Sequence, residues 1–496
     1  MLQLFNDATT DEIDTAMQLA EIASQEYKKY SLKQRAGFMK AIASALFNAD
    51  EELIETAMAE THLPAARLQS EKDRTVFQLT TYANACEKGD WMHVTIDTAD
   101  EKRNPPKTSI RKMMVPIGPV VVFGASNFPF AYSTAGGDTA CAFAAGCPVI
   151  VKAHPAHSNT SQMVAELILK AAEECNMPKG IFTHIHGASV EIGKQLVQHP
   201  LTKAVGFTGS LAGGKQLFDW GNQRKVPIPV FAEMGSVNPV FLLPLKLKNE
   251  WDEIAEMYAG SITLGVGQFC TNPGLIIGIE SDELNYFISA LAQKIKMISP
   301  APMLHPGIAK AFHEKKQNAL LQIGVEKISQ SATIAKENEG MPTIVSTSAQ
   351  NFLENPLLHQ EIFGPYSLII QCKNDDEIFE VAKAMEGQLT TTLMATIDDI
   401  NRYSSLVEAI KNICGRLIYN GVPTGVEVCL SMQHGGPYPA TTDSRFTAVG
   451  PDGIKRFARP LAFQNWPNEL LPDELKDENP LKLWRTIDSE MIPPEL

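Results

Sequence analysis

Apolar side chains recur at spacings of three and four along the chain before about residue 100. The segments DEIDTAMQLAEIASQEY and RAGFMKAIASALFNADEELIETAMAE both follow this pattern. Because an α-helix completes a turn every 3.6 residues, such spacing places the apolar side chains on one face. The pattern therefore predicts a shell of amphipathic helices in the amino-terminal part of the chain.

From about residue 113, short apolar runs alternate with segments of helical length such as SQMVAELILKAAEEC. The runs are PVVVFG (119–124), CPVIVK (147–152), GIFTHIH (180–186), KAVGFTGS (203–210) and PIPVFAEMG (227–235). Strands separated by helices predict parallel βαβ units, which bind ligands at the carboxyl ends of their strands. The fold class is therefore α/β.

Polar or small residues end these predicted strands: Asn127, Lys152, Gly209 with Ser210, and Glu233. Each alone has an ordinary structural interpretation, since an asparagine can cap a turn and a strand-end lysine is often only solvated. Loops at this edge of a sheet nevertheless carry binding and catalytic residues. These positions are the candidate site.

A cysteine, Cys270, lies among small residues in the stretch GVGQFCTNPG. Glycines and a proline let backbone and ligands approach a side chain closely. A thiol that only filled a core would lie among leucine, valine and isoleucine. The stretch therefore favours a thiol that a ligand reaches.

Composition bounds the class of protein. A chain of 496 residues predicts two or three domains, and 44% hydrophobic with 20% charged residues is typical of a soluble globular protein. The net charge of -14 disfavours nucleic-acid binding. The amino terminus has no secretory pattern and no run reaches membrane-spanning length. We expect neither nucleic-acid nor membrane partners.

The eight cysteines contain no CxxC pair, which is typical of free thiols in a reducing compartment, so we expect a cytoplasmic protein. His184 and His186 in THIH could face one side of a strand, as metal ligands do. No third ligand stands at a suggestive spacing, and we expect no metal site.

Six motifs, in chain order, resemble the aldehyde dehydrogenase superfamily: FGASNFPF, VIVKAHP, GFTGS, FAEMGSVNP, GVGQFCTNPG and EIFGP. The resemblance runs from about residue 10 to about residue 470, although the fingerprint GxGxxG is absent. KAHPAHSNTS and SMQHGGPYPATTDSRFTAVG resemble the branch with α-ketoglutarate semialdehyde (2,5-dioxovalerate) dehydrogenases and an NADP-dependent fatty aldehyde dehydrogenase.

The resemblance implies roles for four catalytic residues. Cys270 would attack the aldehyde, because an aldehyde has no leaving group and hydride departs only from a tetrahedral adduct. Asn127 and the Cys270 backbone amide would stabilise the oxyanion. Glu233 would activate the water that releases the acid, and His434 in MQHGGPY would lie near the thiol. A histidine beside two glycines is otherwise usually structural.

The resemblance also implies a nicotinamide dinucleotide cofactor. Its candidate residues are Lys152 for the adenosine ribose, Gly209 and Ser210 near the pyrophosphate, and Glu361 with Phe363 at the nicotinamide ribose. Pro155 replaces a glutamate that grips the ribose hydroxyls in many NAD-preferring relatives, so a 2′-phosphate is not repelled. The cofactor is therefore NADP or NAD, with NADP favoured.

Two further familiar side chains are absent: Ser126 stands where many relatives have tryptophan, and Gly136 where they have lysine. The favoured reaction oxidises α-ketoglutarate semialdehyde to 2-oxoglutarate. Arg445 in TTDSRFTAVG is the candidate for the remote carboxylate, with a loop-binding role as its alternative.

Three other functions stay open. A medium- or long-chain fatty aldehyde dehydrogenase would need an apolar tunnel. Glu233 argues against a dehydrogenase that acylates coenzyme A, since such relatives commonly lack this base. Cys270, Asn127 and Glu233 together argue against a catalytically silent binding relative.

The resemblance implies an architecture. A Rossmann-type nucleotide-binding domain would cover residues 1–235, completed by 431–496, and an α/β catalytic domain would cover 236–430. An extended oligomerisation arm near residues 90–112 would reach a partner subunit. We therefore expect a homodimer or homotetramer that acts on a small aldehyde.

Overall fold

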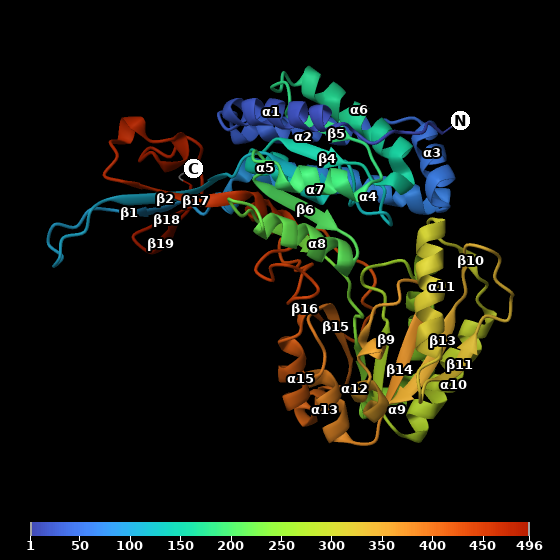
Figure 1. The fold of residues 1–496 in the computed structure, drawn as a ribbon. Helices are drawn as coiled ribbons and strands as arrows, with labels where there is room; N and C mark the ends of the chain where they lie inside the picture. The colour runs from blue at the N-terminus through green and yellow to red at the C-terminus, as the bar shows by residue number, and fades with distance from the viewer. Residues whose placement is uncertain (1, 495–496) are drawn as a thin grey trace.

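Four amphipathic helices form the amino-terminal part of the protein, as the sequence predicts (Figure 1). The computed structural model describes residues 2–494. The helices are α1 (Thr10–Tyr27), α2 (Leu32–Phe47), α3 (Glu51–Thr61) and α4 (Ala65–Lys88). Thr9 and Ser31 begin the first two with capping boxes, which satisfy backbone amides that a helix start leaves unpaired.

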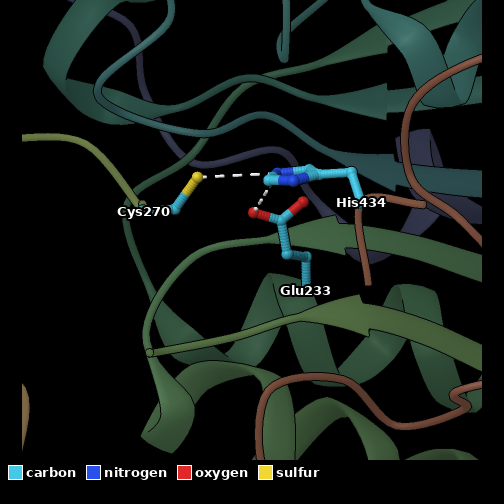
Figure 2. A group of neighbouring side chains, drawn as sticks. All are labelled: Glu233, Cys270 and His434. Atoms are coloured by element: carbon cyan, nitrogen blue, oxygen red, sulfur yellow. Dashed lines mark hydrogen bonds and ion pairs between the residues drawn. The ribbon is translucent and has the colours of Figure 1, made fainter. Parts of the chain in front are cut away.

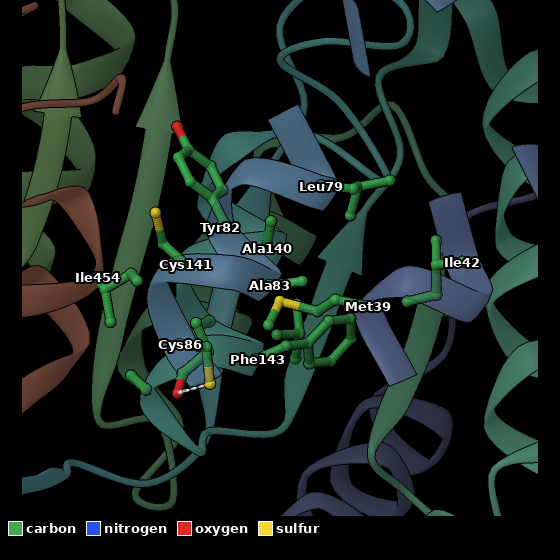
Figure 3. Packing of buried hydrophobic residues seen from close by; sticks show 14 of the residues in the cluster. Met39, Ile42, Leu79, Tyr82, Ala83, Cys86, Ala140, Cys141, Phe143 and Ile454 are labelled. Carbon is green, nitrogen blue, oxygen red and sulfur yellow. Dashed lines mark hydrogen bonds between the residues drawn. The ribbon is translucent and has the colours of Figure 1, made fainter. Parts of the chain in front are cut away.

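A buried apolar cluster joins α2 and α4 to α5 (Gly137–Ala145) (Figure 3). Met39, Leu79 and Phe143 are fully buried within it. Because α5 connects two strands of the adjacent sheet, this packing fixes α4 against the sheet's loops.

A five-stranded parallel sheet contains all five predicted runs, in the order β5-β4-β3-β6-β7. Its strands are β3 (Val120–Phe123), β4 (Val149–Lys152), β5 (Phe182–Ile185), β6 (Ala204–Thr208) and β7 (Val230–Glu233). The helices α6 (Ser158–Glu174), α7 (Val190–Gln198) and α8 (Leu211–Asn222) connect them together with α5. The strand order reverses between β3 and β6, where open α/β sheets bind ligands.

A second sheet of seven strands, in the order β11-β13-β14-β9-β8-β15-β16, forms the lower half of Figure 1. Its strands are β8 (Val240–Leu242), β9 (Leu275–Ile279), β11 (Glu326–Gln330), β13 (Thr343–Ser348), β14 (Tyr366–Cys372), β15 (Gln388–Met394) and β16 (Cys414–Tyr419). Only β11 runs antiparallel to its neighbour.

Seven helices and a two-stranded ribbon accompany this sheet. They are α9 (Pro244–Thr263), α10 (Asp282–Met297), α11 (Pro306–Leu320), α12 (Ala349–Glu354), α13 (Asp375–Lys383), α14 (Ile397–Arg402), α15 (Ser404–Lys411), and the strands β10 (Ala301–Pro302) and β12 (Glu339–Gly340). Within residues 2–494, no helix combines the length and apolarity that crossing a membrane needs.

A third sheet projects to the left of the parallel sheet in Figure 1. It has the order β17-β2-β1-β18-β19 and joins β1 (Thr95–Asp97) and β2 (Ile110–Pro116) to β17 (Ala458–Gln464), β18 (Arg485–Ile487) and β19 (Glu490–Ile492). The expected arm at residues 90–112 lies in this sheet. Its contact with a partner subunit and the domain boundaries at 235 and 430 stay predictions.

Candidate active site

The loop that carries Cys270 follows α9 and turns through three left-handed residues. Gly265, Val266 and Gly267 have φ angles of 54°, 59° and 64°. A Cβ on Gly267 would come within 2.3 Å of the carbonyl carbon and oxygen of Gly364. Glycine is therefore required where this loop touches the EIFGP segment, which explains the small residues around the thiol.

Gly267→Ala is expected to lower the free energy of unfolding by about 1–3 kcal/mol, because the added methyl group displaces a backbone segment. Activity should fall with it, since Cys270 moves. Denaturant unfolding and aldehyde oxidation rates measure both effects. Gly260→Ala on α9 is the control: a Cβ there meets nothing within 4 Å, and helix propensity should raise stability by about 0.5–1 kcal/mol. If Gly267→Ala and Gly260→Ala had the same free energy of unfolding, the predicted clash at Gly267 would be contradicted.

Three of the candidate side chains, from distant parts of the sequence, meet in one cluster (Figure 2). The Cys270 Sγ lies 3.6 Å from His434 Nε2, and that nitrogen lies 3.1 Å from Glu233 Oε1. The thiol, the carboxylate and the imidazole lie within 4.8 Å of one another. His434 and Glu233 are 1% and 3% exposed, so their interaction is shielded from water.

Backbone pairing at the end of β7 holds this cluster. The Met234 amide donates to the Ala440 carbonyl at 2.8 Å, and the backbones of Glu233 and Thr441 form an isolated antiparallel β-bridge. On the other side of the imidazole, the His434 amide donates to Thr447 Oγ1 at 2.9 Å. The segment that carries His434 is thus fixed against the strand that carries Glu233.

The surroundings of Cys270 disfavour its thiolate. Burial raises the pKa of the thiol well above its ordinary value, and the negative charge of Glu233 raises it further. The positive charge of Arg416 acts in the opposite direction. Since the thiolate is the nucleophilic form, a nearby proton acceptor is needed, and His434 Nε2 is within reach.

Asn127 lies in the loop after β3 and points toward the Cys270 loop. Its Nδ2 donates to the Gln268 carbonyl at 3.1 Å. The Asn238 side chain fixes the same loop, because its Nδ2 donates to the Cys270 carbonyl at 2.9 Å. The side-chain amide expected in the oxyanion site is therefore anchored two residues before the thiol.

A cavity of about 440 Å³ opens beside these residues. Asn127, Glu233 and Cys270 line it together with most of the residues expected at the cofactor: Gly209, Ser210, Glu361 and Phe363. The sheet topology therefore brings seven of the ten sequence-derived candidates to one cavity. His434 is not a lining residue, but its imidazole contacts both Cys270 and Glu233, which are (Figure 2).

The residues present fit a dinucleotide. Ser210 begins α8, and its Oγ accepts a hydrogen bond from the Gly213 amide at 3.2 Å, so the amino terminus of a helix faces the cavity where phosphate binds well. Burial raises the pKa of Glu361 to about 7. Lys152 ends β4 and is half-buried outside the lining residues, and burial lowers its pKa.

Comparison with known proteins identifies this fold and site. The sequence pattern of the aldehyde dehydrogenase family matches residues 1–457. This chain belongs to the aldehyde dehydrogenase family. It is therefore an NAD(P)-dependent oxidoreductase that acts on aldehydes.

This chain is similar over nearly its whole length to two curated proteins. One is the α-ketoglutaric semialdehyde dehydrogenase 2 of Azospirillum brasilense, at 44% identity over 98% of this chain and 93% of the relative. The other is the α-ketoglutaric semialdehyde dehydrogenase of Acinetobacter baylyi, at 42% identity over 98% and 92%. These matches confirm the resemblance in the sequence motifs.

A solved structure confirms the fold class of the aldehyde dehydrogenase. The succinic semialdehyde dehydrogenase of Streptococcus pyogenes, solved with NADP⁺, superposes with a TM-score of 0.77. The alignment covers 93% of this chain and 96% of that chain, at 19% identity. At that identity the likeness concerns the fold alone.

Three candidates lie outside the cavity lining: Lys152, His434 and Arg445. Within residues 2–494, Arg445 also makes no hydrogen bond or ion pair with the cluster of Cys270, Glu233 and His434. Its side chain is 79% exposed and forms an ion pair with Asp443, whose Oδ1 accepts a hydrogen bond from Arg445 Nε at 2.8 Å. The guanidinium stacks near Phe446 and lies outside the lining residues. Its local acidic partner already satisfies its charge.

His184 and His186 lie side by side on β5, with ring centroids 4.5 Å apart. Their contacts are to polar side chains of α6: His184 Nε2 lies 2.7 Å from Ser161 Oγ, and His186 Nε2 lies 2.9 Å from Gln162 Oε1. Hydrogen bonding to α6 accounts for both histidines.

Sequence reasoning missed the residues that α4 and the following loops place around the cavity. Phe128 and Tyr132 line it, and Arg67 and Arg74 contact these two rings. The two arginines are seven residues apart on α4, which puts them on one helix face. The spacing predicts that the two arginines share one face of α4, but it does not predict that this face packs against the site.

Proposed function

We propose that this aldehyde dehydrogenase oxidises α-ketoglutarate semialdehyde to 2-oxoglutarate through a thioester on Cys270. The contact chain from Cys270 through His434 to Glu233 carries the chemical part of the proposal. The substrate follows from the two relatives of 42–44% identity, whose names state this activity.

The first step uses His434 as the proton acceptor for the thiol. The proton of Cys270 moves to His434 Nε2, 3.6 Å away, and Glu233 stabilises the resulting imidazolium. The thiolate then forms a bond with the aldehyde carbon, and the carbonyl oxygen becomes an oxyanion. Asn127 Nδ2 and the Cys270 amide donate to that oxyanion.

The cofactor residues are those at the strand ends and in the EIFGP segment. Lys152 and Glu361 would bind the two riboses, Gly209 and Ser210 the pyrophosphate, and Phe363 would pack beside the nicotinamide ribose. A bound nicotinamide would supply the hydride acceptor, and loss of hydride from the thiohemiacetal carbon would leave a thioester on Cys270. Pro155, which has no carboxylate to repel a 2′-phosphate, favours NADP over NAD.

Glu233 completes the reaction as a general base. It takes a proton from the water that attacks the thioester, and the carbon–sulfur bond breaks to release the acid and the Cys270 thiolate, which takes back the proton held by His434. The side chain is buried at the end of β7 and lines the cavity, so it is shielded from bulk solvent and adjacent to the reacting carbon.

The remaining parts of the proposal concern assembly and location. The β17-β2-β1-β18-β19 sheet projects from the body of the protein, which suits contact with a second subunit in a homodimer or homotetramer. All eight cysteines are free, as expected for a cytoplasmic enzyme.

A substrate panel tests the proposed activity. We expect kcat/KM to be highest for α-ketoglutarate semialdehyde, lower for succinate semialdehyde, and lowest for hexanal and decanal. Absorbance of the reduced nicotinamide, with NAD and with NADP, measures each rate. The rate should not require coenzyme A. A preference for decanal would instead assign a fatty aldehyde substrate, and a strict need for coenzyme A would replace hydrolysis by acyl transfer.

A further inference from the structure

Two arginines of α4 reach the lining of the cavity. Arg67 Nη2 donates to the Asn127 carbonyl at 3.0 Å, and its Cζ lies 4.9 Å from the centroid of the Phe128 ring. Arg74 Cζ lies 5.8 Å from the centroid of the Tyr132 ring. Asn127, Phe128 and Tyr132 line the cavity, so both guanidinium groups contact residues of its lining, although neither arginine is itself a lining residue.

These guanidinium groups have donors that the protein does not satisfy. Arg67 Nη1 and the Nε and Nη2 of Arg74 are buried and have no hydrogen-bond partner within residues 2–494. Buried polar groups in native proteins are nearly always paired, because an unpaired one loses its bonds to water without replacement. Unpaired guanidinium donors next to the residues that line a cavity suit an anionic group on a ligand.

One carboxylate of the protein faces the pair, and most of its hydrogen-bonding capacity is used elsewhere. Glu71 Oε1 accepts hydrogen bonds from the Phe130 and Ala131 amides at 2.8 and 3.0 Å. Its other oxygen lies 3.8 Å from Arg67 Nη1, which is too long for a hydrogen bond. Burial raises the pKa of Glu71, the positive charges of Arg67 and Arg74 both lower it, and the buried guanidinium donors still have no hydrogen-bond partner within residues 2–494.

The arginines are also close to the reacting centre. Arg67 contacts Asn127 and, with Cζ 5.5 Å from its ring centroid, Phe269, the residue before Cys270. Arg74 contacts Tyr132, whose ring centroid is 6.4 Å from that of His434. The aldehyde and carboxylate carbons of α-ketoglutarate semialdehyde are separated by four bonds, which span roughly 5 Å. A residue that binds this carboxylate must therefore lie about one substrate length from the Cys270 thiol.

We propose that Arg67 and Arg74 bind the remote carboxylate of an oxo-acid semialdehyde and so select charged over uncharged aldehydes. This inference rests on the proposed function, because it assumes a substrate with such a carboxylate. The planar guanidinium groups provide the paired donors that a carboxylate accepts, and the substrate supplies the acceptor that the buried nitrogens lack. Arg445, exposed and paired with Asp443, does not take this role.

The test measures a selectivity ratio: kcat/KM for α-ketoglutarate semialdehyde divided by kcat/KM for hexanal. Arg74→Leu should lower this ratio about 30-fold, the effect of losing hydrogen bonds to a charged group. Arg74→Gln should lower it similarly, and Arg74→Lys should restore part of it. The change should appear mainly in KM for the charged aldehyde. Arg67→Lys tests the second arginine with its charge retained and should lower the ratio less than Arg74→Leu.

Two further variants separate this assignment from other causes. Arg402→Leu removes an exposed arginine that pairs with Asp375 on a distant surface, and should leave the ratio unchanged. Arg445→Leu should also leave it unchanged. Melting temperatures of all variants identify any that fold poorly. If Arg74→Leu does, the selectivity ratio of Arg74→Gln, the more conservative neutral change, tests the assignment.

The outcomes distinguish the two proposals. If wild-type enzyme prefers hexanal, the proposed substrate fails and the arginine assignment fails with it. If the wild type prefers the charged aldehyde but both neutral variants at Arg74 keep the wild-type ratio, only the arginine assignment is wrong. If the selectivity ratio falls in Arg445→Leu but is unchanged in Arg74→Leu, the substrate carboxylate binds at the loop after residue 440 and not at α4.

Discussion

Cys270→Ala is expected to reduce aldehyde oxidation by at least about 10⁴-fold, the scale of losing a covalent nucleophile. The alanine side chain cannot form the tetrahedral adduct, and His434 then has no thiol proton to accept. Steady-state formation of reduced nicotinamide by the purified variant measures the loss. The variant should keep its melting temperature within a few degrees, since Cys270 lies on a loop whose fold depends on glycine and on Asn238.

Cys175→Ala is the matched control. Cys175 is a free, half-exposed cysteine at the carboxyl end of α6, and neither the cluster nor the cavity includes it. Its replacement should leave the rate within about twofold of the wild type, as expected for a surface change away from the site. If Cys270→Ala retained more than a hundredth of the wild-type rate, a covalent role for this thiol would be untenable.

The five-stranded sheet could be predicted because its strands are short and buried. Parallel strands covered on both faces are continuous apolar runs, and Val120–Phe123 is buried along its whole length. The edge strand Glu326–Gln330 has the sequence EKISQ and is largely exposed, so it has no such run. Its position comes from pairing with Thr343–Ser348, which the local sequence does not encode.

The site was predictable where a motif surrounds the residue and not where the role depends on packing. Cys270 is marked by its glycines, and the structure gives the reason at Gly267, which touches the backbone of Gly364. The resemblance of MQHGGPY to related sequences also points to His434, and the structure adds its contacts with the thiol and the carboxylate. These contacts result from the pairing of its segment with β7.

The two sets of arginines show the same limit. Arg445 is a candidate for the substrate carboxylate because its segment is near His434 in the sequence. In the structure its guanidinium donates a hydrogen bond to Asp443, two residues earlier. Arg67 reaches Asn127 only because α4 packs against the loop after β3, a contact across sixty residues. In the proposed assignment, recognition of the substrate carboxylate depends on how α4 packs and not on proximity to His434 in the sequence.

Glu233→Gln is expected to separate the two halves of the reaction, because only thioester hydrolysis needs an activated water. Steady-state turnover should fall about 10²–10⁴-fold, the usual contribution of a general base. Rapid mixing with substrate and cofactor should show a burst of reduced nicotinamide that approaches one per active site, followed by slow turnover. Mass spectrometry of the stopped reaction should find the acyl group on Cys270. Wild-type turnover in this variant would contradict the assignment.

The same variant should make the resting thiol more acidic. Burial is the largest cause of the raised pKa of Cys270, and the charge and hydrogen bonding of Glu233 come next. A neutral glutamine removes that charge, so the pKa falls and the thiolate fraction at any given pH rises. Iodoacetamide should therefore alkylate Cys270 at lower pH in Glu233→Gln than in the wild type. Glu256→Gln is the control, because Glu256 is an exposed residue of α9 that forms an ion pair with Lys294 of α10. It should leave the alkylation profile unchanged.

The two measurements on Glu233→Gln together decide how the carboxylate acts. A burst with an alkylation profile shifted to lower pH means that Glu233 serves hydrolysis and opposes the resting thiolate, while His434 accepts the thiol proton. Loss of the burst despite that shift would mean that Glu233 also activates the thiol, through the imidazole that it contacts at 3.1 Å. In that case the double variant with His434→Ala should lose no more burst than Glu233→Gln alone, because two residues that act as one relay are not additive.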